Sequence, residues 1–150
     1  SKVIDFLLTK GCDIHLKDTK GNTLAFYLVN TFEKNDEKSF EKKLKILINR
    51  GLSMNQNQSD GNSLLHIAAK KNNLELLRRL SQFGIDINAV NNSGYTVLHL
   101  ASMMAKDESI IKYLLNEGAD KNIKTEFDET AFTLAQENEL LKNKNIEYLK

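Results

Sequence analysis

The chain contains Asp60-Gly61-Asn62-Ser63-Leu64-Leu65-His66-Ile67-Ala68-Ala69, and this stretch decides the fold because it occurs more than once. It returns 33 residues later as Ser93-Gly94-Tyr95-Thr96-Val97-Leu98-His99-Leu100-Ala101-Ser102. Weaker copies begin at Lys20 and at Phe127. A fixed period of this size is typical of repeat proteins, in which each unit packs against its neighbours. The pattern therefore predicts an array of similar structural units.

A second pattern runs in phase with the first and marks where helices begin and end. Glycines follow apolar runs of helical spacing at four positions: Gly11, Gly51, Gly84 and Gly118. Hydroxyl residues precede short apolar stretches at four others: Thr23, Ser63, Thr96 and Thr130. Glycine commonly ends a helix in a left-handed conformation, and serine or threonine commonly caps its first turn. Each unit is therefore predicted to be helix, turn, helix and hairpin-like loop.

These residues resemble the ankyrin repeat, whose consensus reads roughly D-x-x-G-x-T-P-L-H-x-A-A, a second helix, and L-L-x-x-G-A-D-V-N. The resemblance covers the whole chain and implies an all-α solenoid. It predicts a single array over residues 1–150, with a partial repeat at 1–17, repeats at about 18–57, 58–90 and 91–124, and a partial repeat at 125–150. The chain departs from the consensus at each proline, at two histidines (Phe26 and Thr133) and at one turn glycine (Asp128).

The array also differs from the consensus in its insertions and in the apolar residues at its two ends. The spacing from Gly11 to Gly51 exceeds the period by seven residues. We expect residues 30–39 to extend the helices on either side. One extra residue falls near residues 104–107. We expect residues 139–145 to lengthen the first helix of the last repeat. Apolar residues lie at both ends, at Val3, Ile4 and Phe6 and at Ile146, Tyr148 and Leu149. Terminal repeats of a solenoid usually carry a polar outer face, so this pattern predicts a fragment of a longer array.

Composition excludes several classes of function. With 150 residues and a net charge of +1, the chain has the size of one domain and lacks the basic excess of a nucleic-acid-binding protein. Its single cysteine, Cys12, excludes an internal disulfide, and no apolar run approaches the roughly 20 residues of a membrane span. We expect a soluble cytoplasmic protein that binds neither nucleic acid nor membrane. The 18 lysines and 17 asparagines indicate an AT-rich genome, such as that of some bacteria.

The sequence predicts neither catalysis nor a metal or cofactor. His66 and His99 occupy the same position in adjacent repeats, where helices about 8–10 Å apart keep their rings from sharing a metal. The resemblance implies that this histidine ties a loop to its helix by hydrogen bonds. Cys12 has no base directed towards it, and the chain lacks a glycine-rich phosphate loop or paired acidic residues. We therefore expect no enzyme and no small-molecule substrate.

The resemblance implies that the chain binds a protein partner through its hairpin tips and the exposed face of each first helix. Seven residues fall at such positions and are the candidate binding residues: Tyr95, Met103, Met104, Phe127, Lys70, Lys71 and Asn62. Exposed aromatic and methionine side chains are typical of interfaces. The alternatives are that Phe127 packs under its own hairpin and that Met104 fills a gap beside the extra residue. The charge also drifts along the chain, from +3 over residues 1–50 to −3 over residues 101–150.

The function we expect is that of a non-enzymatic protein–protein interaction module. Two alternatives remain at this point. The array is a substrate-targeting segment of a larger enzyme or secreted effector, or it is a structural spacer without a partner of its own.

Overall fold

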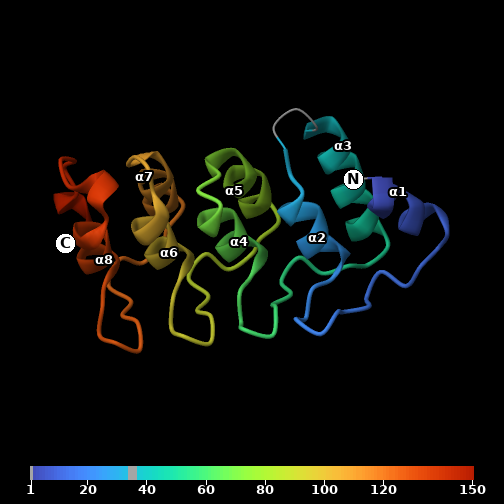
Figure 1. Ribbon diagram of the computed structural model, residues 1–150, viewed down its shortest axis with the longest axis horizontal. Helices are drawn as coiled ribbons and strands as arrows, with labels where there is room; N and C mark the ends of the chain where they lie inside the picture. The colour runs from blue at the N-terminus through green and yellow to red at the C-terminus, as the bar shows by residue number, and fades with distance from the viewer. Residues whose placement is uncertain (1, 34–36) are drawn as a thin grey trace.

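The computed structural model describes residues 2–33 and 37–150 and is helical throughout (Figure 1). Its elements are α1 (Lys2–Thr9), α2 (Leu24–Asn30), α3 (Glu37–Asn49), α4 (Leu64–Lys70), α5 (Leu74–Ser81), α6 (Val97–Met104), α7 (Ser109–Asn116) and α8 (Ala131–Glu137), followed by the 3-10 turns η2 (Glu139–Leu141) and η3 (Glu147–Leu149). No strand occurs in these two ranges. The predicted all-α fold is confirmed.

The helices form two rows, with hairpin loops projecting along one edge (Figure 1). The inner helices are α2, α4, α6 and α8, and each packs against the next. The outer helices are α1, α3, α5 and α7. Helices α1 and α8 lie at opposite ends of the array, so the repeats follow one another in a line.

Inner helices lie between neighbours and are buried on most sides. The first six residues of α4 are all buried, and only its last residue, Lys70, is exposed. Small residues such as Ala68 and Ala101 let adjacent helices approach closely. The outer helices are amphipathic, as in α5, which buries Leu76, Leu77 and Leu80 and exposes its other face. An inner helix thus presents only one to three side chains to solvent.

Hairpins close in the same way in successive repeats and join edge to edge. The N–H of Asn91 donates to the carbonyl of Tyr95 at 3.0 Å, and the N–H of Asn92 donates to the carbonyl of Asp60 in the preceding hairpin at 3.0 Å. Gly61 has φ +80°, and a Cβ there would lie 2.7 Å from the backbone nitrogen of Asn92. Only glycine fits this close approach.

The seven-residue insertion lengthens only one of its two flanking helices. Helix α2 has 7 residues, as α4 has, whereas α3 has 13 against 8 in α5. Phe32 and Phe40, which flank this segment in the sequence, pack edge to face with ring centroids 4.8 Å apart. The expected extension of the first helix is therefore wrong, and residues 34–36 lie outside the described ranges. The single extra residue lies in α6, which has 8 residues.

The last repeat differs from the expected helix extension through residues 139–145. Helix α8 ends at Glu137 because Asn138 is extended and its side chain accepts a bond from the N–H of Leu140. The same amide donates to the carbonyls of Ser102 and Ala105, both at 2.9 Å.

The two ends of the array also differ in how they treat their apolar residues. At the C-terminal end Leu149 is 1% exposed, and Ile146 and Tyr148 pack against the core. At the N-terminal end Ile4 is buried, whereas Val3 and Phe6 are 66% and 60% exposed. The expected apolar surface is thus present at the N-terminal end, whereas at the other end η3 packs on α8, which buries Leu149 and leaves Ile146 and Tyr148 half-buried.

Candidate functional site

The inner face consists of the exposed residues of the inner helices together with the tips of the hairpins. The seventh residues of α2, α4, α6 and α8 are equivalent, and all four are exposed: Asn30, Lys70, Met103 and Glu137. Because the inner helices pack side by side, these side chains form a row across the array. The residues two positions earlier in each helix are buried, so this row supplies much of the chemistry of the face.

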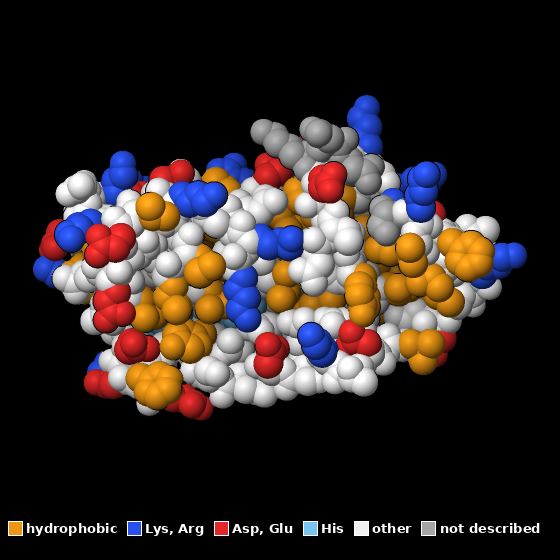
Figure 2. Space-filling view, in the orientation of Figure 1, with side chains coloured by type: hydrophobic (Ala, Val, Ile, Leu, Met, Phe, Trp, Pro, Cys, Tyr) orange, Lys and Arg blue, Asp and Glu red, His pale blue; other side chains and the backbone are white. Residues whose placement is uncertain are grey.

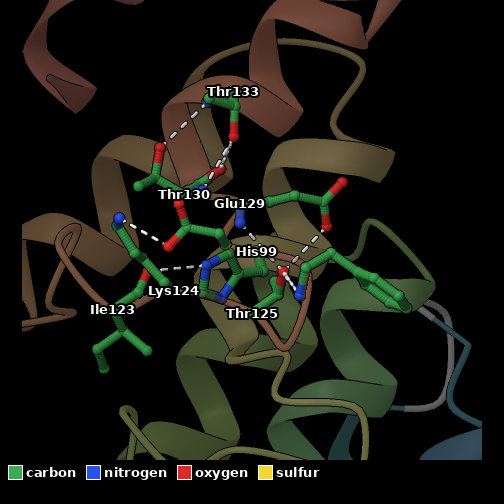
Figure 3. Close-up of polar contacts among 9 residues, drawn as sticks. His99, Ile123, Lys124, Thr125, Glu129, Thr130 and Thr133 are labelled. Carbon is green, nitrogen blue, oxygen red and sulfur yellow. Dashed lines mark hydrogen bonds and ion pairs between the residues drawn. The ribbon is translucent and has the colours of Figure 1, made fainter.

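His66 fixes the inner helix to the next hairpin. Its Nδ1 accepts the N–H of Ser63 at 3.1 Å and also contacts the Ser63 hydroxyl at 2.7 Å. Its Nε2 donates to the carbonyl of Tyr95 at 2.9 Å. His99 repeats this arrangement with Thr96 and with the carbonyl of Ile123 at 3.0 Å (Figure 3). The predicted hydrogen-bonding role of both histidines is confirmed, and burial lowers the pKa of both rings.

Two repeats lack this histidine and fill its place differently. In α8, Thr133 accepts the N–H of Thr130 at 2.9 Å, so the cap is kept without a bond to another hairpin (Figure 3). In α2, the fully buried ring of Phe26 takes the position, and the Thr23 hydroxyl is left without a partner among the described residues. The departures from the consensus are therefore local changes in capping.

The last hairpin holds Phe127 at its tip in an exposed position. The hydroxyl of Thr125 donates to the Glu129 carboxylate at 3.0 Å and accepts the N–H of Phe127 at 3.2 Å (Figure 3). Phe127 is 71% exposed, so it does not pack under its own hairpin. Asp128 takes the place of the turn glycine with φ 62° and pairs with Lys124 at 2.8 Å.

Three of the predicted binding residues form the exposed apolar part of the inner face. Met103 is 42% exposed, Met104 is 47% exposed and Phe127 projects from the next hairpin. Figure 2 shows a cluster of hydrophobic side chains over α6, with basic side chains beside it over α4. Lys70 and Lys71, which end α4, are both exposed as expected.

Tyr95 and Asn62 are less accessible than the sequence suggested. Tyr95 is half-buried and meets His99 edge to face at 6.2 Å, and burial and the Glu129 carboxylate raise the pKa of its hydroxyl. Asn62 is only 1% exposed, so its predicted place on the surface is wrong. The reason is that its amide donates to Asp60 and accepts from the Asn91 amide at 2.9 Å, which joins two hairpins.

Sequence reasoning missed Glu137, which lies in the same row as Lys70 and Met103. The signal was present: counting seven residues from each N-cap would have found it. Neither Lys70, Lys71 nor Glu137 forms an ion pair with another residue in the part of the chain that the structure describes.

The outer helices carry a groove of about 420 Å³ between α3 and α5, which is a different kind of site. Arg79 lines it and pairs with three carboxylates: Glu37 at 2.9 Å, Glu75 at 2.7 Å, and Glu41. Because its charge is already compensated, Arg79 is poorly suited to hold an anionic ligand. The ion pairs of Arg79 therefore link α5 to α3, and its guanidinium group is not free to bind a ligand.

Comparison with protein families decides what the repeats are. A model described as "Ankyrin repeats (3 copies)" matches residues 34–125. The chain belongs to the ankyrin repeat family. His66 and His99 lie within the matched residues and both cap an inner helix.

Proteins similar to this chain come from viruses and from animals. The chain is 32% identical to ankyrin repeat protein FPV031 of fowlpox virus over 85% of its own length and 36% of that protein. It is 29% identical to ankyrin repeat protein OPG189 of variola virus over 86% of the chain and 23% of that protein. It is 29% identical to protein phosphatase 1 regulatory subunit 12A of rat over 79% of the chain and 12% of that subunit. The chain thus spans about a third or less of these relatives.

Within residues 2–33 and 37–150, no three His, Cys, Asp or Glu side chains lie together as metal ligands would. Cys12 is a free, half-buried thiol beside the cap of α1. Among the described helices, none has both the length and the apolar character to cross a bilayer.

Proposed function

We propose that this ankyrin array is a non-enzymatic protein–protein interaction module that binds its partner on the inner face. The observation that carries the proposal is the exposed apolar group formed by Met103, Met104 and Phe127. These side chains contribute little to the core, since each leaves 42% or more of its surface in water. Large exposed apolar side chains gathered on one face are typical of binding surfaces.

The chemistry of the group suits a protein partner. Methionine side chains are flexible and polarisable and adapt to irregular apolar surfaces, and an aromatic ring supplies a large contact area. A few such residues usually provide most of the binding energy, while the polar residues around them exclude water. The net charge of +1 gives little attraction for a phosphate backbone, so a protein is the better partner.

The test begins by locating the partner on the array. A photo-reactive amino acid placed at Met103 should cross-link a partner in the source cells, whereas the same group at Lys45 on the outer helix α3 should not. The affinity of that partner is then measured for Met103→Ala and Phe127→Ala. We expect each to weaken binding by at least about tenfold, the loss typical of a central interface residue.

The matched control is Phe6→Ala, because Phe6 is 60% exposed and lies on the outer helix α1. It should leave affinity unchanged. Tyr95→Ala is a poorer test, since this half-buried ring packs on His99 and its loss would also lower stability. Cross-linking only at Lys45, or full affinity of both inner-face variants, would overturn the proposal.

A second candidate function is that of a targeting segment within a larger regulatory protein or effector. It is favoured by the similarity to a phosphatase regulatory subunit, of which the matched region is 12%. In this case the protein captured at Met103 would also be a target of the parent protein's activity. Loss of that activity towards the target on Met103→Ala, with activity towards a generic substrate unchanged, would support it.

A further inference from the structure

We infer that the inner face recognises a protein segment in which acidic, apolar and basic side chains follow one another in that order. The inference rests on the proposed function and specifies the partner's chemistry. It starts from the row of equivalent positions in α4, α6 and α8, which carries an ammonium group at Lys70, a thioether at Met103 and a carboxylate at Glu137. Charge therefore changes sign across three successive repeats at one structural position.

Side chains next to this row add to its positive charge, its apolar character and its negative charge at the respective positions. Lys71 adds a second exposed cation at the end of α4, and Met104 adds a second exposed thioether at the end of α6. At the acidic end, the carboxylate of Glu129 lies in the last hairpin, in the position that Tyr95 holds one repeat earlier. Figure 2 shows the same sequence on one face: basic side chains over α4, hydrophobic ones over α6 and acidic ones over α8.

The charges at both ends are available to a partner. Lys70, Lys71 and Glu137 form no ion pair among the described residues, in contrast to Arg79 on the outer side, which contacts three carboxylates. A bound segment would place carboxylates on the lysines and a cation on Glu137, with its apolar residues on the two methionines. Such complementarity fixes the register and direction of the partner, while the apolar centre supplies most of the affinity.

The size of the row sets the length of the segment. Adjacent packed helices lie about 8–10 Å apart, so α4 and α8 are separated by about 16–20 Å. An extended chain covers that distance with about six residues and a helix with about 13. Segments carrying only one kind of charge fit poorly, because they meet a like charge at one end of the row.

The experiment selects binders from a displayed library of about 16 random residues, a length that covers either conformation. Wild type should enrich segments with an acidic end, an apolar centre and a basic end. The triple variant Lys70→Glu, Lys71→Glu, Glu137→Lys should enrich the opposite order. A matched outer-face variant, Lys42→Glu, Lys45→Glu, Glu117→Lys, makes the same change in net charge and should keep the wild-type order.

Affinity measurements complete the test. A wild-type binder should lose about tenfold in affinity for the triple variant at low ionic strength, and less at high salt, because exposed charges are screened. Thermal melting verifies that each variant is folded. If the triple variant unfolds, Lys70→Gln, Lys71→Gln, Glu137→Gln replaces it, and it should select apolar segments without charge order.

The outcomes separate this inference from the proposed function. Binders without charge order that still require Met103 would overturn the inference and leave the binding face intact. The same charge order selected by wild type and by the triple variant would also overturn it. Binders that ignore both Met103 and the charges, or no binders at all, would contradict both proposals.

Discussion

Replacing His66 by phenylalanine tests whether the inner helices depend on their histidine hydrogen bonds or only on filled volume. His66 is fully buried and bonds the N–H of Ser63 at 3.1 Å and the carbonyl of Tyr95 at 2.9 Å. His66→Phe keeps an aromatic ring of similar size, as Phe26 does in α2. It leaves the Ser63 N–H and the Tyr95 carbonyl without that partner.

The expected loss depends on the other partners of these two groups. The Tyr95 carbonyl still accepts the N–H of Asn91, so the Ser63 N–H is the group that loses its partner. A buried polar group without a partner costs about 1–3 kcal/mol, and we expect the free energy of unfolding to fall by about that amount. For a chain of this size the melting temperature should fall by about 2–12 °C. Urea unfolding followed by far-UV circular dichroism measures the difference. His15→Phe is the control, because His15 is exposed and should change stability by less than about 0.5 kcal/mol.

Acid adds a second readout of the same interaction. Burial lowers the pKa of His66 and His99, so the unfolded chain binds protons near pH 6.5 while the folded chain keeps both rings neutral. Stability from this source is present above about pH 6.5 and is lost as the pH falls, by up to about 1.4 kcal/mol per histidine per pH unit. His66→Phe should remove about half of this slope. Unchanged stability together with an unchanged slope would refute the reasoning.

Two further predictions concern capping and the last turn. Thr23→Val should leave the free energy of unfolding unchanged or slightly higher, because the Thr23 hydroxyl is buried without a partner among the described residues, whereas Thr96→Val should cost about 1 kcal/mol through loss of its cap. Equal losses in urea titrations would contradict this difference. Asp128→Gly should stabilise by about 0.5–1 kcal/mol, since φ 62° strains any residue with a side chain and the exposed pair with Lys124 adds little. A lower melting temperature would show that this pair matters more than the strain.

The sequence alone was sufficient to predict the helices whose ends are marked by a capping residue or a glycine. The cap at Ser63 and the glycine at Gly84 each have one physical role, and the structure places both as predicted. The end of α8 could not be found in this way. Residues 131–145 contain neither glycine nor proline, and the helix stops because the side chain of Asn138 bonds carbonyls of the preceding repeat. That contact joins residues more than 30 positions apart, so no local pattern reveals it.

The candidate binding face was predictable only in part, for a related reason. Asn62 was expected at the surface because hairpin residues are usually solvated, but contact with the next hairpin buries it. Tyr95 is also half-buried, and its ring packs on His99 of the same repeat. Met103 and Phe127 were placed correctly, since their exposure depends on their own helix or hairpin tip.

Equivalent positions of the four inner helices differ in whether their residues can determine binding specificity. At the fifth residue of the inner helices the chain has Leu28, Ala68, Ala101 and Ala135, and all four are buried. Two positions further on it has Asn30, Lys70, Met103 and Glu137, which are all exposed and differ in both polarity and charge. Packing restricts the first set to apolar residues, because a polar group there would be buried without a partner. The second set is free of that restriction, so its order of charge can serve recognition at little cost to the fold.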